Sequence, residues 1–249
     1  MDLTATKLFD IQGRNALATG GTSGIGLMMA KGLIANGIGT LYVTGNEPPE
    51  VFDQRIRVLH SFAQASGSNC VIYGCVSPCA PIYRQGRIGQ VDLSRPDEIK
   101  KLSNFLHEQE DNLDILLSNA GIRRDPTIPV KSYSTARLAE IQESLLSHSH
   151  AAWGETFSVN STAHFFLVAE LLDLLGESAK LGDGRGCVVI TSSCASMHNC
   201  TNVDLTSYAA SKAATDHIVA MLAAKVGRFG IRVNGINPGC ISLSILMLI

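Results

Sequence analysis

Short apolar runs alternate along the chain with longer stretches in which apolar residues recur at helical spacing. The apolar runs predict β-strands, which we place at 14–18, 40–44, the edges of the irregular stretch 67–87, 113–117, 186–191 and 231–236. The stretches between them predict helices, which we place at 27–36, 51–65, 160–175 and 206–229. A further helix is predicted to start at 94–98, and a long polar stretch occupies 123–150. Such alternation is typical of βαβ units. We therefore expect an α/β fold with a doubly wound parallel sheet, built as a single domain over residues 1–249.

Composition excludes several classes of protein. The chain has 249 residues, of which 45% are hydrophobic and 17% are charged, so it can build a sizeable core and does not resemble a disordered chain. Its formal net charge of -2 argues against nucleic acid or an acidic membrane as a main partner. No apolar run approaches the ~18 residues of a transmembrane helix, and residues 1–4 lack the pattern of a signal peptide. We therefore expect a cytoplasmic protein.

The cysteines do not predict a metal site. There are 7 of them, and an odd count without a secretory signal favours reduced thiols. Cys70, Cys75 and Cys79 are spaced by five and four residues, unlike the close pairs of zinc sites. We expect no bound metal.

A glycine-rich turn joins the first predicted strand to the first predicted helix. Glycine lets the backbone turn tightly and approach a pyrophosphate, and the N-terminus of the following helix offers N–H groups and the positive end of its dipole. The strand–turn–helix context therefore predicts a dinucleotide site. The residues that we assign to this site are Thr19, Gly20, Thr22, Ser23, Gly24, Ile25 and Gly26.

A second pattern lies on one predicted helix. Tyr208 and Lys212 are four residues apart and so share one helical face. A nearby ammonium favours the phenolate and lowers the pKa of a tyrosine, which at its usual value of ~10 is a poor proton shuttle at neutral pH. The pair therefore indicates proton transfer, and an incidental surface pair is the alternative.

The turn and the Tyr208–Lys212 pair resemble those of the short-chain dehydrogenase/reductase family. The turn has the family's spacing, Gly-x-x-x-Gly-x-Gly preceded by Thr, and the resemblance extends over residues 8–241. It implies a Rossmann fold and an NAD(P)-dependent enzyme that interconverts a ketone and a secondary alcohol by hydride transfer. The stretches 192–199 and 123–150 are similar to those of the 3-oxoacyl-carrier-protein reductase branch.

The same resemblance implies roles for four catalytic residues. Tyr208 gives or takes the proton at the substrate oxygen, and Lys212 binds ribose and lowers the pKa of the tyrosine. Ser193 hydrogen-bonds the substrate carbonyl; it lies 15 residues before Tyr208, two more than is usual in the family, and we choose it over Ser196. Asn160 holds a water that relays protons to the lysine, and a structural hydrogen bond is the competing interpretation.

Further contacts to the cofactor follow from the resemblance. The residues that it assigns are Asp92, Asn119, Ala120, Gly121, Pro238, Gly239 and Ile241. Asp92 would contact the adenine ring, and a strand-end cap is the alternative. Asn119 would help to hold the sheet and line the cofactor, and the alternative is a turn residue with a mainly architectural role. Leu243 stands where the family has the threonine that binds the carboxamide.

The end of the second predicted strand bears on the choice of cofactor. An acid there would bind the ribose 2′-hydroxyl and favour NAD, but the matching position is Gly45. Asn46 follows, where NADP enzymes of the family often have Arg, and Arg14 is a basic residue near the first strand. We predict NADP, with NAD as the alternative, and include Asn46 among the cofactor-binding residues.

The resemblance also sets expectations for the end of the chain and for assembly. Family members continue beyond Pro-Gly with a last helix and a seventh strand, whereas this chain stops at Ile249. We therefore expect the last strand and helix to be missing, and keep as an alternative a truncated, catalytically impaired dinucleotide-binding protein. Family members pair through the helices that here hold Asn160 and Tyr208, so we expect a homodimer or homotetramer. The expected partner is a small-molecule carbonyl or alcohol, not nucleic acid or a membrane.

Overall fold

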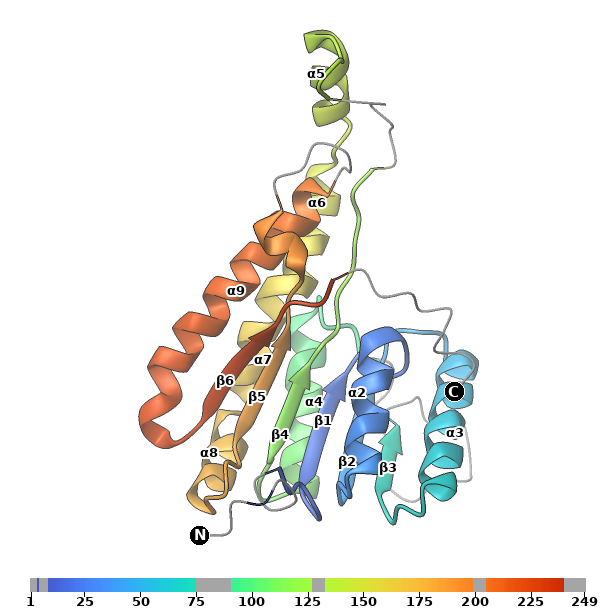
Figure 1. Cartoon of the computed structure of the whole chain (residues 1–249), viewed down its shortest axis with the longest axis vertical. Coiled ribbons are helices and arrows are strands. Elements are labelled where there is room, and N and C mark those ends of the chain that lie inside the picture. The colour runs from blue at the N-terminus through green and yellow to red at the C-terminus, as the bar shows by residue number, and fades with distance from the viewer. Residues whose placement is uncertain (1–3, 5–8, 75–90, 127–132, 199–204, 240–249) are drawn as a thin grey trace.

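A parallel sheet forms the centre of the protein. The computed structural model describes residue 4 and residues 9–74, 91–126, 133–198 and 205–239. Within these parts the sheet has six strands in the order β3-β2-β1-β4-β5-β6 (Figure 1). They are β1 (Asn15–Thr19), β2 (Thr40–Thr44), β3 (Val71–Gly74), β4 (Ile115–Ser118), β5 (Cys187–Thr191) and β6 (Arg232–Ile236). The order reverses between β1 and β4, which is where open α/β sheets bind their ligands.

Helices connect the strands and pack on both faces of the sheet (Figure 1). The first three are α2 (Gly24–Ala35), α3 (Pro49–Ala65) and α4 (Pro96–Gln109). Between β4 and β5 come α5 (Leu138–Leu146), α6 (His150–Phe157), the π-helical turn η1 (Ser158–Thr162), α7 (Ala163–Glu170) and α8 (Leu172–Lys180). Beyond β5 lie the 3₁₀ turn η2 (Cys194–Met197), α9 (Thr206–Val226) and the 3₁₀ turn η3 (Gly227–Phe229).

Each strand buries alternate side chains on opposite faces of the sheet. Leu17 and Val188 belong to a cluster that the sheet forms with α4, α7, α8 and α9. Ala16 and Leu117 belong to a second cluster, formed with α2 and α3. Because both faces are packed, the strand ends are held firmly, and the loops that follow them can carry precisely placed side chains.

The predicted fold class, a doubly wound parallel sheet, is confirmed. The predicted strands at 14–18, 40–44, 113–117, 186–191 and 231–236 are present, with ends that differ by at most two residues. In the stretch 67–87, β3 occupies 71–74. The first helix begins at Gly24 instead of 27, because Gly24 with φ 52° already leads from the turn into the helix.

One predicted helix has the wrong bounds, and one stretch without a predicted helix contains one. The helix placed at 160–175 is part of a run from 150 to 180 that is interrupted at Leu171, which has non-helical backbone angles. The polar stretch 123–150 contains α5, which extends away from the sheet (Figure 1). Its buried residue is Ser144, while Leu138 and Leu146 are exposed, so the apolar residues of α5 do not face the core.

Some expectations fall outside the described residues. The inserted loop expected within 67–87 lies largely in 75–90, and the expected loss of the last strand and helix concerns 240–249. Over the part of the chain that the structure describes, no helix is both long and apolar enough to cross a membrane. In that same part, no three His, Cys, Asp or Glu side chains gather as a metal site would require.

Candidate active site and cofactor cleft

One cleft of about 1090 Å³ runs along the carboxyl ends of the strands. Its walls come from the glycine turn, from the residues that follow β2, β4, β5 and β6, and from the start of α9. The predicted site residues that line it are Gly20, Thr22, Ser23, Ile25, Asn46, Asp92, Asn119, Ala120, Gly121, Ser193, Tyr208, Lys212, Pro238 and Gly239. Thr19, Gly24, Gly26 and Asn160 are not among its lining residues, and Ile241 lies outside the described residues.

The glycine turn has the geometry that a phosphate cradle needs. Gly20 and Gly24 have φ angles of 60° and 52°, which favour glycine. A Cβ on Gly26 would lie 2.1 Å from the carbonyl oxygen of Gly20, so no larger residue fits there. The N-cap residue of α2, Ser23, makes no side-chain capping bond. The N–H groups of the first helical turn therefore face the cleft without a side-chain cap, as an anion site requires.

Asn119 and Thr19 join β4 to the glycine turn. The Thr19 hydroxyl oxygen accepts the N–H groups of Asn119 at 3.0 Å and Ala120 at 3.2 Å. The Asn119 amide nitrogen donates to the carbonyl oxygens of Thr19 and Gly20, both at 3.3 Å. The architectural interpretation of Asn119 therefore holds, and its backbone also lies in the wall of the cleft.

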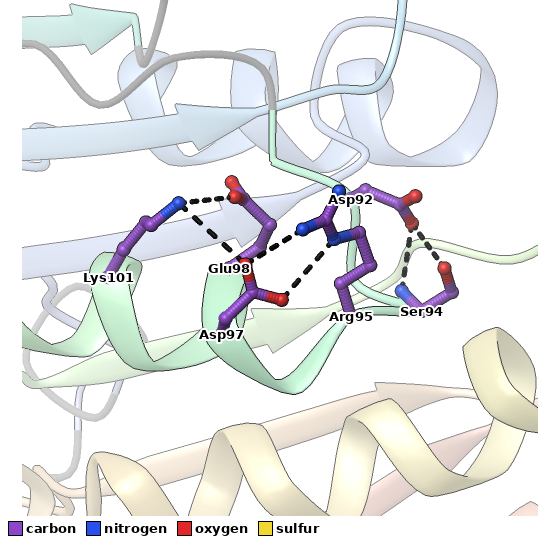
Figure 2. A network of polar contacts seen from close by, with 6 residues as sticks. All are labelled: Asp92, Ser94, Arg95, Asp97, Glu98 and Lys101. Atoms are coloured by element: carbon purple, nitrogen blue, oxygen red, sulfur yellow. Dashed lines mark hydrogen bonds and ion pairs between the residues drawn. The ribbon is translucent and has the colours of Figure 1, made fainter.

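Asp92 caps its own loop and also lines the cleft. Its Oδ1 accepts hydrogen bonds from the Ser94 N–H at 2.9 Å and the Ser94 hydroxyl at 2.7 Å (Figure 2). The neighbouring Arg95 instead pairs with Asp97 at 3.0 Å on the exposed start of α4 (Figure 2). The capping interpretation of Asp92 is therefore correct for Oδ1, and its contact with adenine stays a prediction.

Tyr208 and Lys212 lie together on α9, as their spacing predicts. The Lys212 Nζ is 5.9 Å from the centre of the Tyr208 ring and donates to the Thr191 carbonyl oxygen at 2.8 Å. Lys212 is only 2% exposed. Burial lowers the pKa of its ammonium to about 8, and the negative charge of Asp216 acts in the opposite direction. The lysine is thus a buried cation placed next to the phenol.

Ser193 lies where β5 ends and η2 begins. Its Oγ accepts the Ala195 N–H at 3.1 Å, so the hydrogen of the hydroxyl is available for a substrate oxygen. Ser193 lines the cleft together with Tyr208, whereas Ser196 is not among the lining residues and its Oγ accepts from Asn237. The geometry therefore favours Ser193 over Ser196.

Asn160 is fully buried in the π-helical turn η1. Its Oδ1 accepts the Ile122 N–H at 2.7 Å, and its Nδ2 donates to the Ile122 carbonyl at 2.9 Å and to the Ser211 hydroxyl at 3.0 Å. The structural interpretation of Asn160 is therefore correct: it clamps the segment after β4 to α9. The proposed water relay stays a prediction.

The comparisons with known proteins decide the family. The model of the family described as short chain dehydrogenase matches residues 80–247. The chain is 30% identical, over 242 residues, to the short-chain dehydrogenase/reductase PhomF of Diaporthe leptostromiformis, and the match covers 95% of this chain and 73% of that protein. The chain belongs to the short-chain dehydrogenase/reductase family.

A curated relative and a solved structure from Pseudomonas aeruginosa are also similar to this short-chain dehydrogenase. The rhamnolipids biosynthesis 3-oxoacyl-(acyl-carrier-protein) reductase is 28% identical over 231 residues, covering 93% of this chain and 74% of that protein. The solved complex of RhlG with NADP has a TM-score of 0.72 at 26% identity, covering 98% of this chain and 78% of that chain. The predicted enzyme class, an NAD(P)-dependent oxidoreductase, and the likeness to the 3-oxoacyl-carrier-protein reductase branch are thereby confirmed.

The sequence analysis missed three buried polar groups around the cleft. Glu47 lines the cleft, and its Oε1 accepts the Thr22 hydroxyl hydrogen at 2.5 Å. Its second carboxylate oxygen, Oε2, is buried without a hydrogen bond. His164 is fully buried, with Nδ1 2.7 Å from the Ser118 hydroxyl, and burial lowers its pKa to about 3 with a contribution from the Lys212 charge. The third is Asp125, in the segment after β4, which accepts a hydrogen bond from Ser207 at the start of α9. Glu47 alone carried a signal in the sequence, because it is an acid just beyond the end of β2.

Proposed function

We propose that this short-chain dehydrogenase interconverts a ketone and a secondary alcohol with NADP(H), using Ser193, Tyr208 and Lys212, with Asn160 in support. One observation carries the proposal: the serine, the tyrosine and the lysine line the same cleft as the glycine turn. A nucleotide held by the turn and a carbonyl held by Ser193 and Tyr208 would therefore meet within a single cavity.

The described residues fit a dinucleotide. The side-chain-free cradle at Gly20, Gly24 and Gly26 and the start of α2 suit a pyrophosphate. The Lys212 ammonium, with three donors and one of them used by Thr191, can also donate to ribose hydroxyls. When bound, the cofactor supplies the hydride, and the protein supplies orientation and electrostatics.

Side chains of the protein transfer the proton to and from the substrate. In the reducing direction the phenol of Tyr208 donates its proton to the substrate oxygen, and the Ser193 hydroxyl donates a hydrogen bond to the same oxygen. The ammonium group of Lys212 lies 5.9 Å from the centre of the Tyr208 ring. In the oxidising direction the phenolate takes the proton back from the alcohol.

The choice of NADP(H) rests on the end of β2 and on the relatives. Gly45 and Asn46 place no acid directly after the strand, and the related RhlG was solved with NADP. Glu47 acts against this choice, because its carboxylate lines the cleft and would repel a 2′-phosphate. NAD(H) therefore remains the competing cofactor, and direct titration separates the two.

A homodimer or homotetramer paired through α7 and α9 is part of the proposal. Phe166 on α7 is 51% exposed and Met221 on α9 is 45% exposed, so each helix presents an apolar side chain that a second copy would cover. Light scattering over a range of concentrations would detect the assembly, and a monomer at every concentration would contradict it.

The deciding experiment compares Tyr208→Phe with the wild type. Both are titrated with NADPH and NADH, and then assayed on a panel of ketones that includes a 3-oxoacyl thioester, a polyketide ketone, a sterol ketone and a sugar ketone. We expect NADPH binding in both proteins and a loss of turnover of about 10²–10⁴-fold in the variant. Tyr133→Phe is the matched control, because Tyr133 bonds Ser144 and does not line the cleft.

Two outcomes would overturn the assignment. Full turnover by Tyr208→Phe would remove the tyrosine from the mechanism. Nucleotide binding by the wild type without turnover of any ketone in the panel would favour the alternative, a catalytically impaired dinucleotide-binding protein.

A further inference from the structure

A carboxylate from a distant segment lies against the first turn of the catalytic helix. The Asp125 side chain is completely buried, and its Oδ1 accepts the Ser207 N–H at 2.9 Å and the Ser207 hydroxyl at 2.6 Å. The same oxygen is 3.4 Å from the backbone nitrogen of Tyr208, which also donates to it. Asp125 thus holds the backbone of the residue that we place at the centre of the chemistry.

Helix α9 needs this carboxylate, because it lacks a cap of its own. The first N–H groups of any helix have no partner within the helix. The residue at the N-cap of α9 is Leu205, whose side chain cannot accept a hydrogen bond. Asp125 supplies the missing acceptor from 82 residues earlier in the chain, and its negative charge suits the positive end of the helix dipole.

The segment that carries Asp125 is itself fixed to the catalytic helices. Asn160 makes two hydrogen bonds to the backbone of Ile122 and a third to Ser211 on α9. Arg123 lies 3.5 Å from the second oxygen of Asp125 and lines the cleft. The segment 121–125 is therefore linked to α9 at two places, directly through Asp125 to Ser207 and Tyr208, and through Asn160 to Ser211.

We propose that Asp125 is a positioning residue for Tyr208, which sets the position of the first turn of α9 so that the phenol faces the cleft. The inference rests on the proposed function, since it concerns the geometry of Tyr208 during turnover. Asp125 makes no contact with the reacting atoms and acts only through the backbone of Ser207 and Tyr208. Misplacing a catalytic group by about 1 Å can cost about 100-fold in rate.

The test compares Asp125→Ala with Asp125→Asn in the full chain. The amide oxygen of asparagine is still a hydrogen-bond acceptor for Ser207 and Tyr208, whereas alanine offers none. We expect kcat with the best ketone of the panel to fall about 100-fold in Asp125→Ala, with the KM for NADPH little changed. We expect Asp125→Asn to recover most of the rate.

Asp114→Ala is the matched control for a purely structural loss. Asp114 is equally buried and accepts from Asn15, Ser178 and Arg185, but it lies at the other end of the sheet, before β4. We expect this variant to be destabilised while the folded fraction keeps its kcat. A similar fall of kcat in Asp114→Ala, or no rescue by Asp125→Asn, would overturn the positioning role.

Hydrogen exchange provides a readout that needs no substrate. The N–H groups of Ser207 and Tyr208 should exchange faster in Asp125→Ala than in the wild type, and should be protected again in Asp125→Asn. Unchanged exchange in Asp125→Ala would overturn the inference, whatever the enzyme assays give. Failure of the proposed function looks different, because then the wild type itself turns over no ketone, or Tyr208→Phe is fully active.

Discussion

Replacing Lys212 with methionine should stabilise the protein in the absence of nucleotide. Burial lowers the pKa of Lys212 from 10.5 to about 8. Lowering a pKa by one corresponds to about 1.4 kcal/mol, so holding the buried ammonium costs about 3 kcal/mol of unfolding free energy at neutral pH. Methionine keeps the length of the side chain and removes the charge. The loss of the hydrogen bond to Thr191 removes about 1 kcal/mol of this gain, so the unfolding free energy of Lys212→Met should exceed that of the wild type by about 2 kcal/mol.

The pH dependence gives this prediction its sign. Between pH 8 and 10.5 the unfolded chain holds a proton on Lys212 that the native protein has released, so the wild type gains stability as the pH rises through this window. Below pH 8 the cost is fully present. The stability advantage of Lys212→Met should therefore shrink from about 2 kcal/mol at pH 7 to about 1 kcal/mol at pH 9.

Urea unfolding at pH 7, 8 and 9, followed through the single tryptophan, Trp153, measures the difference. Lys225→Met is the control, since Lys225 is on the same helix and exposed, and its effect should not vary over this pH range. The Lys212→Met variant should also lose affinity for NADPH. A Lys212→Met protein that is less stable than the wild type at pH 7, or an advantage that does not change with pH, would refute the reasoning.

Three further changes test the surroundings of the cleft. Gly26→Ala should abolish NADPH binding and lower the melting temperature, because its Cβ would lie 2.1 Å from the oxygen of Gly20, whereas Gly32→Ala on the same helix meets no atom within 4 Å and should be tolerated. Glu47→Gln should raise the affinity for NADPH more than the affinity for NADH in fluorescence titrations, since it removes a negative charge beside the expected 2′-phosphate. Equal effects on the two affinities would argue against that placement of the phosphate. Burial lowers the pKa of His164 to about 3, so below pH 6.5 the unfolded chain binds a proton that the native protein does not. The wild type should therefore lose about 2 kcal/mol of unfolding free energy between pH 6.5 and 5, as measured by urea unfolding. The His164→Leu variant should not show this loss.

The sheet was predictable because its strands are buried on both faces and so appear as continuous apolar runs. The stretch Val188–Ile190 is such a run, and β5 (Cys187–Thr191) differs from the predicted strand 186–191 by one residue. Helix α5 was not predicted, although Leu138, Ile141 and Leu145 recur at helical spacing. It is a short helix, and its leucines at 138, 145 and 146 are exposed and form no buried stripe against the sheet.

The candidate site was predictable where its residues are neighbours in sequence. The glycine turn and the Tyr208–Lys212 pair are local patterns, and each has a spacing that its chemistry requires. Asp125 could not be found in this way, because its partners Ser207 and Tyr208 are 82 and 83 positions away and no periodicity connects them. Contacts of that kind depend on the fold as a whole.

Space and hydrogen bonding together explain the motif at 119–121. Thr19 fixes the first two residues through their N–H groups. A Cβ on Gly121 would lie 3.3 Å from the Asn160 Oδ1 and 3.4 Å from the Lys212 Nζ, so glycine leaves room for the buried ammonium. The side chain of Asn160 is used by Ile122 and Ser211, and its main-chain carbonyl oxygen accepts the Thr215 hydroxyl hydrogen. A water relay through Asn160 would therefore share its acceptor atoms with these structural hydrogen bonds.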